Sequence, residues 1–175
     1  MAFANPQEFV KQLDLSPRST VADFGAGSGA WTLALSKYLT GGTVYAIDIQ
    51  KELLGSLQTE ATKAGLANIH YLQGDLESRG GSKLADEEVD VVLIANILFQ
   101  SKLKYSIALE AKRILKRTGQ VVVIEWKESF GGIGPKAEDV VSAKEIQEVF
   151  GQAGFVEQST IDVSDQHYAM IFVKG

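Results

Sequence analysis

The chain has 175 residues, of which 45% are hydrophobic and 22% charged, and it carries a net charge of −5 without any cysteine. This length and composition predict one globular domain over residues 1–175 that can bury a full core. The absence of cysteine excludes thiol nucleophiles, and two histidines alone make no convincing metal site. The net negative charge argues against nucleic acid as a partner.

The N-terminal half alternates between helix and strand patterns. Asn5, Pro6 and Glu8 are typical of a helix start, as N-cap, first-turn proline and first-turn carboxylate, and this helix runs to about Leu13. Strands are expected at 20–24, 43–48 and 69–73, helices at 29–39 and around 53–61 with an end at Gly65, and a polar loop at 77–88.

The C-terminal half continues the alternation and then breaks it. A strand apolar on both faces is expected at 89–95, a helix at 101–116, a turn at Thr118-Gly119, and a strand at 120–126. The glycines and the proline of 131–135 indicate an irregular loop, and Ser142 opens a capping box for a last helix that stops near Gly154. Strands at 155–163 and 168–173 follow, joined tightly through 164–166.

Strands that alternate with helices, with continuously apolar inner strands, predict a parallel sheet covered by helices on both faces. The tight final hairpin requires antiparallel pairing. The expected fold class is therefore α/β, a Rossmann-like doubly wound seven-stranded sheet that is mostly parallel with an antiparallel C-terminal strand.

The first expected strand ends at three glycines on alternate positions, in the run Asp23-Phe24-Gly25-Ala26-Gly27-Ser28-Gly29. Nineteen residues after Gly29, the second strand ends at Asp48. Such a strand, glycine turn and helix bring backbone close to a nucleoside, and a carboxylate at the next strand end binds the two ribose hydroxyls. Two plainer readings are that the glycines serve packing alone and that Asp48 caps the following helix.

The glycine spacing also indicates which kind of nucleoside fits. Dinucleotide sites usually read G-x-G-x-x-G, whereas this chain reads G-x-G-x-G with Asp23 just before it. A carboxylate there would repel a pyrophosphate and favour a positively charged ligand. The alternative of an NAD-dependent oxidoreductase also lacks a Tyr-x-x-x-Lys pair, since Leu109 stands four residues after Tyr105.

The run 23–29, followed by Ala46-Ile47-Asp48, resembles the first two motifs of class I methyltransferases that depend on S-adenosylmethionine (SAM). The resemblance covers about Asn5 to Val173. Within the class, 115–119, 125–127 and 152–155 make the chain similar to the small ubiquinone/menaquinone-biosynthesis type. The resemblance implies SAM as cofactor.

In the family, the glycine turn passes under the methionine part and the ribose, an acidic residue after the third strand binds the adenine amino group, and the next residue packs on the ring. Trp31 could cover the methionine part or pack in the core. The expected cofactor-binding residues are Asp23, Gly25, Ala26, Gly27, Gly29, Trp31, Asp48, Ile49, Asp75, Leu76, Ala95 and Asn96.

The chain departs from its relatives around the acceptor. Many relatives carry histidines after the fourth strand, where this chain has Leu98-Phe99-Gln100, and many have several N-terminal helices over the site, where this chain has one. Such an open front suggests either a large acceptor or a second subunit, so a homo-oligomer is compatible with the sequence. An Asn-Pro-Pro-Tyr type motif for exocyclic nitrogens is absent.

No residue stands out as the general base, which methyl transfer needs only when the acceptor must lose a proton. Glu125, His167 and Tyr168 are candidates. The plainer reading makes Glu125 a structural carboxylate and His167 an exposed hairpin residue.

The sequence thus predicts a SAM-dependent methyltransferase that prefers a small-molecule acceptor. The alternatives are a SAM-binding domain without catalysis, and an RNA or protein methyltransferase that acts with a partner. The lysines and arginines of 102–117 then form either a solvated helix face or an RNA-binding patch. Met1–Pro6 has no features of a signal peptide and no apolar run could span a bilayer, so a cytoplasmic location is expected.

Overall fold

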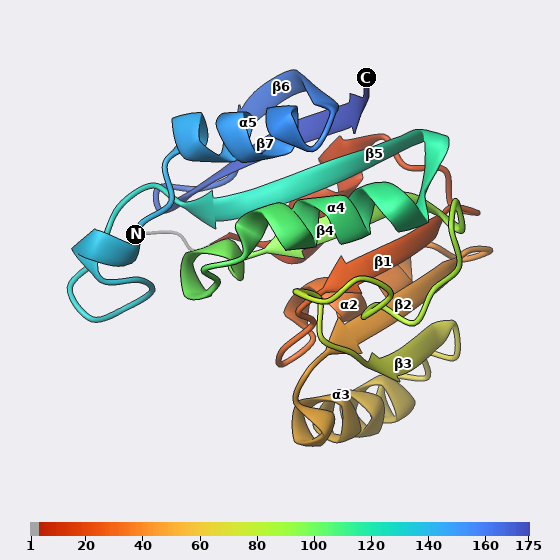
Figure 1. Ribbon diagram of the computed structural model, residues 1–175. Coiled ribbons are helices and arrows are strands. Elements are labelled where there is room, and N and C mark those ends of the chain that lie inside the picture. The colour runs from red at the N-terminus through yellow and green to blue at the C-terminus, as the bar shows by residue number, and fades with distance from the viewer. Residues whose placement is uncertain (1–3) are drawn as a thin grey trace.

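A computed structural model describes residues 4–175. Met1, Ala2 and Phe3, which begin the segment predicted not to be a signal peptide, lie outside the described residues. One seven-stranded sheet forms the centre of the molecule, in the order β3-β2-β1-β4-β5-β7-β6 (Figure 1). Its strands are β1 (Thr20–Phe24), β2 (Thr43–Asp48), β3 (Ile69–Gln73), β4 (Val89–Ala95), β5 (Leu115–Trp126), β6 (Phe155–Asp162) and β7 (His167–Lys174).

Among the seven strands, β7 runs in the direction opposite to the other six. The pairs β1–β2, β1–β4, β2–β3 and β4–β5 are parallel, and β7 pairs antiparallel with both β5 and β6. This arrangement confirms the predicted fold class. The edge strand β6 carries an irregular register between Glu157 and Ser159.

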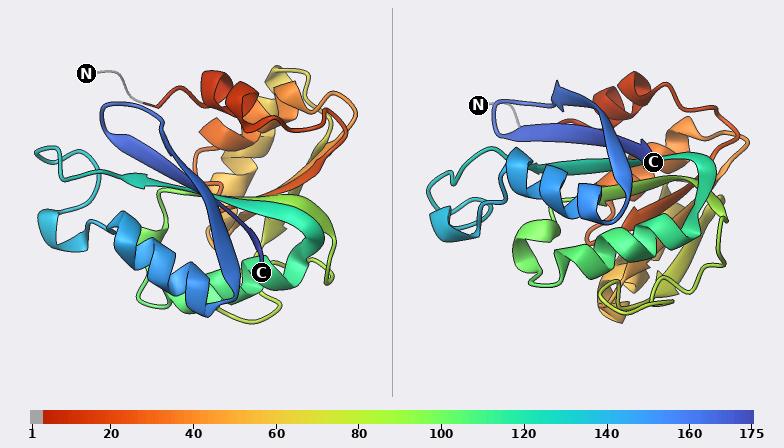
Figure 2. Two further views of the ribbon diagram at one scale, coloured as in Figure 1. Left: turned by 90° about the horizontal axis from the view of Figure 1, so that it is seen from above. Right: turned by 45° about the horizontal axis from the view of Figure 1, so that its top comes forward.

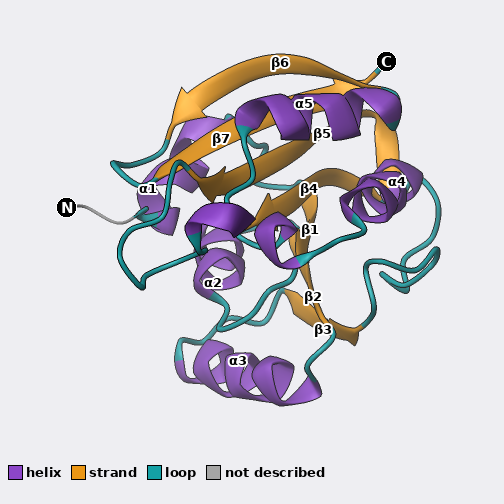
Figure 3. Cartoon of the chain, turned by 60° about the vertical axis from the view of Figure 1, so that its left-hand side comes forward, coloured by secondary structure: helices purple, strands orange, loops and turns teal. Residues whose placement is uncertain are grey.

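Helices cover both faces of the sheet (Figures 1 and 3). On one face lie α1 (Pro6–Val10), α2 (Ala30–Tyr38) and α3 (Lys51–Lys63), and on the other lie α4 (Lys104–Ile114) and α5 (Ala143–Gln152). Short 3-10 turns follow α1 at Lys11–Leu13, precede α4 at Leu98–Gln100, and precede α5 at Ala137–Asp139. None of the helices within residues 4–175 has both the length and the apolar character needed to cross a bilayer.

The helix starts follow the predicted capping chemistry. Asn5 Oδ1 accepts from the N–H groups of Gln7 and Glu8, at 3.1 and 3.4 Å, and Ser142 Oγ accepts from Glu145 N–H at 3.1 Å. A side chain that satisfies these otherwise unpaired N–H groups stabilises a helix by about 1 kcal/mol.

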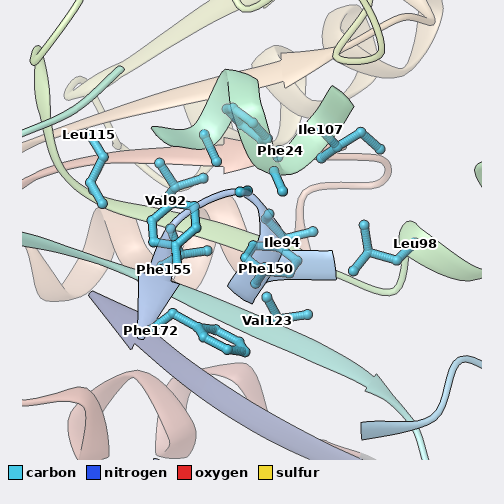
Figure 4. Packing of buried hydrophobic residues seen from close by; sticks show 14 of the residues in the cluster. Phe24, Val92, Ile94, Leu98, Ile107, Leu115, Val123, Phe150, Phe155 and Phe172 are labelled. Atoms are coloured by element: carbon cyan, nitrogen blue, oxygen red, sulfur yellow. The ribbon is translucent and has the colours of Figure 1, made fainter. Parts of the chain in front are cut away.

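Each sheet face buries its own apolar cluster. Under α4 and α5, the ring of Phe150 stacks on that of Phe172, with ring centroids 5.0 Å apart, and contacts the ring of Phe155, with centroids 5.7 Å apart (Figure 4). Strand β4 contributes to both clusters, with Val92 and Ile94 on this face and Val91 and Leu93 on the other. Its position at the middle of the sheet explains why it is apolar on both sides.

The predicted boundaries around α4 were wrong. The helix begins at Lys104 rather than Ser101, because Ser101 is extended and its hydroxyl accepts from Leu103 N–H at 2.9 Å. The helix ends at Ile114, and β5 begins at once, since Leu115 pairs with Val89 of β4. The predicted turn at Thr118-Gly119 is therefore part of a long β5.

Candidate functional site

A cleft of about 580 Å³ opens at the carboxyl ends of β1, β2, β3 and β4, where ligands bind in open α/β sheets. Its size is within the usual range for small-molecule sites. The acidic residues on its wall are Asp48, Asp75 and Glu77, and no lysine or arginine of the described chain lines it. The whole wall comprises Gly25, Ala26, Gly27, Ser28, Ala30, Trp31, Asp48, Ile49, Gln50, Leu53, Gly74, Asp75, Leu76, Glu77, Ala95, Asn96, Ile97, Gln100, Ser101 and Ile107.

The glycine turn forms one wall of this cleft and is fixed by Asp48. Gly25, Gly27 and Gly29 all have positive φ, which explains why the turn needs glycine at alternate positions. Asp48 Oδ2 accepts from Gly27 N–H at 2.8 Å, and Oδ1 accepts from Gln50 N–H at 2.9 Å. A carboxylate offers about four acceptor sites, so Asp48 retains capacity for two ligand hydroxyls. The N-cap of α3 is Gln50, so Asp48 is not that cap.

Asp23 is not on the cleft wall. It is 1% exposed under the glycine turn, and Thr32 Oγ1 donates to its Oδ2 at 2.5 Å. Burial, together with repulsion from Asp48, raises the pKa of Asp23 to about 6. Any effect of Asp23 on a cationic ligand would therefore act across the turn rather than by direct contact, and its predicted role in cofactor binding stays a prediction.

Two apolar side chains and one carboxylate lie together at the β2 and β3 end of the cleft. Ile49 is 61% exposed although it is a large aliphatic residue, and Leu76 is buried. Asp75 accepts from Glu77 N–H at 3.0 Å and from Ser78 Oγ at 2.9 Å, so its carboxylate also holds the turn after β3. A flat ring system would find apolar contact and a hydrogen-bond acceptor here.

The opposite end of the cleft lies at β4. Trp31 is half-buried, lines the cleft, and packs edge-on against Phe9 with ring centroids 5.9 Å apart. It therefore lines the cleft and also packs against α1, and its predicted contact with the methionine part stays a prediction. Ala95 and Asn96 also line the cleft, Asn96 has φ +58°, and its Oδ1 is buried without a hydrogen-bond partner.

The three candidate bases are outside the cleft wall. Glu125 is fully buried, and its Oε1 accepts from Leu98 N–H at 2.8 Å, so it holds the segment after β4. Burial raises its pKa to about 7. Tyr168 donates its hydroxyl hydrogen to Val141 O at 2.8 Å, and burial raises its pKa. His167 is 3% exposed, so the reading of an exposed hairpin residue was wrong.

Sequence reasoning missed a contact that joins two cleft walls. Ser101 Oγ donates to Glu77 Oε1 at 2.5 Å and links the loop after β3 to the segment after β4. Gln50 of the β2–α3 connection and Leu53 in the first turn of α3 also line the cleft. No sequence pattern predicts the Ser101–Glu77 pair, because polar loop residues 24 positions apart show no local pattern.

Residues 22–123 match the family model described as a methyltransferase domain. The chain belongs to this family. Among curated relatives, it is 27% identical to the demethylmenaquinone methyltransferase of Lactococcus lactis subsp. lactis over 168 residues, which is 78% of this chain and 66% of that protein. It is 45% identical to the release factor glutamine methyltransferase of Moorella thermoacetica over 67 residues, or 38% of this chain and 24% of that protein. The chain thus spans less than two thirds of the length of these relatives.

The fold of this methyltransferase-domain chain is also found in solved structures. A SAM-dependent methyltransferase from Aquifex aeolicus superposes with a TM-score of 0.87 and 27% identity, over 97% of this chain and 89% of that one. The family model and this neighbour confirm the predicted resemblance to class I SAM-dependent methyltransferases.

Proposed function

We propose that this chain binds SAM in the cleft at β1–β4 and transfers its methyl group to an acceptor, with a small molecule preferred. The charge of the cleft wall carries this proposal. Three carboxylates line it, and no lysine or arginine of residues 4–175 does. Such a wall disfavours the phosphates of a dinucleotide and favours a nucleoside that bears a sulfonium and an ammonium.

The residues present fit such a ligand in one orientation. Asp48 is expected to accept hydrogen bonds from the ribose hydroxyls beside the glycine turn. The adenine would pack between Ile49 and Leu76 with its amino group toward Asp75. The methionine part would then point along the turn toward Trp31, and the sulfur toward Ala95 and Asn96 at the end of β4.

When bound, SAM supplies an electrophilic methyl group and a neutral leaving group. This chain's own residues would contribute mainly alignment, which can lower a barrier by about 7–11 kcal/mol. Glu125 and Tyr168 are each engaged with backbone groups. This geometry favours an acceptor that needs no strong base from the protein, or one that loses its proton to solvent.

A calorimetric titration with SAM and with NAD tests the proposal. We expect SAM to bind and NAD not to. Asp48→Ala should weaken SAM binding about ten- to a hundred-fold, because hydrogen bonds to a charged group contribute about 1.5–3 kcal/mol. Glu148→Ala, which removes an exposed carboxylate from α5, is the matched control and should leave the affinity unchanged. Equal affinity in the Asp48 variant, or tighter binding of NAD, would contradict the proposal.

The acceptor is tested with methyl-labelled SAM and separated fractions of small molecules, RNA and protein. The relative that matches 78% of this chain is named for demethylmenaquinone and the one that matches 38% for a release factor. Label in the small-molecule fraction is therefore the expected result, and label in RNA or protein would overturn the preference. Binding without transfer to any fraction would favour a SAM-binding domain without catalysis.

The basic residues of 102–117 give little support to an RNA-binding patch. Lys104, Arg113, Lys116 and Arg117 each form an ion pair with a carboxylate of the same chain. The cytoplasmic location expected from the sequence, and assembly with a second copy, stay predictions.

A further inference from the structure

Within residues 4–175, the buried side-chain polar atoms that lack a hydrogen-bond partner lie around the carboxyl ends of β4 and β5. Asn96 follows β4, Glu125 and Trp126 end β5, Gln166 directly precedes β7, and His167 begins it. The atoms are Asn96 Oδ1, Glu125 Oε2, Trp126 Nε1, Gln166 Nε2 and Oε1, and His167 Nε2. An unpaired buried polar group destabilises the folded state. Of these groups, Trp126 Nε1 and His167 Nε2 belong to register partners on one sheet face, which points to a ligand that pairs with them.

Trp126 and His167 lie on the same sheet face as the cleft residue Ala95. They are register partners in the antiparallel β5–β7 ladder, with ring centroids 4.2 Å apart. Side chains alternate along β5, and Ile124, two residues before Trp126, packs in the same cluster as Ala95, its partner on β4. A strand spacing of about 4.8 Å and a rise of about 3.3 Å per residue place the Trp126 backbone about 8 Å from that of Ala95.

The hydrogen bonds of Ser164 decide which nitrogen of His167 carries the proton. Ser164 Oγ accepts from the N–H groups of Gln166 and His167, both at 3.2 Å, and these bonds use its two acceptor sites. Its hydroxyl hydrogen is left to donate to His167 Nδ1, 3.3 Å away. Burial, and then the charge of Lys127, lowers the pKa of His167, so the ring is neutral at pH 7. The proton is therefore on Nε2, and His167 Nε2–H and Trp126 Nε1–H are two unpaired donors on neighbouring rings.

We propose that Trp126 and His167 form the methyl-acceptor subsite, and that it receives a hydroxyl or carbonyl oxygen of an uncharged acceptor. This inference rests on the proposed methyl-transfer function. An oxygen with two lone pairs matches the two N–H donors. An ion would have to be buried here without a free counter-charge, since Lys127 already pairs with Asp162 at 2.9 Å.

The segment from Lys127 to Val141 covers this subsite. The ring of Phe130 lies 6.2 Å from that of Trp126, and a Cβ on Gly134 would come within 2.7 Å of the Trp126 ring. Ser129 Oγ donates to Pro135 O at 2.8 Å and closes the base of the loop. Figure 2 shows this segment projecting beyond the sheet, beside the end of β5. An acceptor that reaches the Trp126 face must displace it, and the rings favour a flat acceptor.

Nuclear magnetic resonance of the ¹⁵N-labelled protein tests the subsite. Phenol is the probe, and toluene, which has the same ring but no hydroxyl group, is the control compound. Phenol should shift the indole N–H signal of Trp126, identified by its loss in Trp126→Phe, and the Nε2 signal of His167, and toluene should not. A long-range ¹H–¹⁵N spectrum should show the Nε2-protonated tautomer. No phenol shift at either ring, or the Nδ1-protonated tautomer, would overturn the inference.

The titrations are run with and without S-adenosylhomocysteine, so that the two proposals fail separately. If S-adenosylhomocysteine shifts the Gly27 amide signal but phenol shifts neither ring, the acceptor subsite is wrong and the cofactor site stands. If phenol shifts both rings and S-adenosylhomocysteine binds nowhere, the subsite stands and the proposed function is wrong.

Discussion

Replacing Glu125 with glutamine should stabilise the protein, and the gain should grow as the pH rises. Glu125 is 0% exposed, one of its oxygens accepts from Leu98 N–H, and the other has no partner. Burial raises its pKa from 4.5 to about 7. The folded state therefore holds this proton more tightly than the unfolded chain does, and ionising Glu125 above pH 4.5 costs folding free energy.

The size of the effect follows from the pKa difference. Each pKa unit corresponds to about 1.4 kcal/mol. Between pH 5 and pH 8.5, the wild type should lose about 2–3 kcal/mol of unfolding free energy through this group. Most of that loss should occur below pH 7, because Glu125 is already ionised in both states at higher pH. Glutamine keeps the oxygen that accepts from Leu98 and carries no charge, so the variant should not show this loss.

Urea unfolding at pH 5, 7 and 8.5 measures the difference. Glu148→Gln, on the exposed surface of α5, corrects for the general change in net charge. A difference between Glu125→Gln and wild type that stays constant from pH 5 to 8.5 would show that the carboxyl group titrates normally. Burial would then not raise the pKa of Glu125.

Two further tests concern packing and a buried ion pair. Gly29→Ala should destabilise the fold by about 2–4 kcal/mol, because φ at Gly29 is +87° and the new Cβ would lie 2.0 Å from Leu57 Cδ1. Gly55→Ala in α3 should instead stabilise the fold by about 0.5–1 kcal/mol, because no atom lies within 4 Å of the new Cβ. Chemical unfolding that shows equal effects of the two substitutions would refute this contrast. For Glu110, burial opposes ionisation, but hydrogen bonds from Arg113 and Ser82 lower its pKa to about 2. Its contribution is thus complete above pH 4.5 and is lost as the pH falls toward 2. Glu110→Gln should cost about 3 kcal/mol at pH 7 and less at pH 3 in urea unfolding, and an equal cost at both values would contradict this assignment.

The parts of the site that sequence predicts well are those encoded by local patterns. Three glycines on alternate positions after an apolar run define a turn with positive φ, and Asp48 stands at the end of the next strand in chain order. Parallel pairing of β1 and β2 then brings Asp48 to Gly27. The register between β1 and β2 follows from the short connections and the apolar pattern of the strands, so it can be predicted without knowing which residues far away in the sequence pair with them.

The parts that sequence misses depend on pairing between distant segments. Helix propensity alone extends α4 to Lys116, but Leu115 pairs with Val89 and the ladder ends the helix. In the same way, His167 is two residues past an exposed turn, and only its pairing with Trp126 shows that it is buried. A polar residue at the end of a predicted hairpin strand gives no local sign of such burial.

The irregular edge strand β6 has a consequence for how copies of this chain can associate. Exposed edge strands offer free backbone N–H and C=O groups that other chains can pair with, which leads to aggregation. In β6 the register breaks between Glu157 and Ser159, and Gln158, Ser159 and Thr160 are solvated. A second molecule that added its own strand here would meet a kinked backbone and polar side chains. We therefore expect self-assembly, where it occurs, to use surfaces other than the β6 edge.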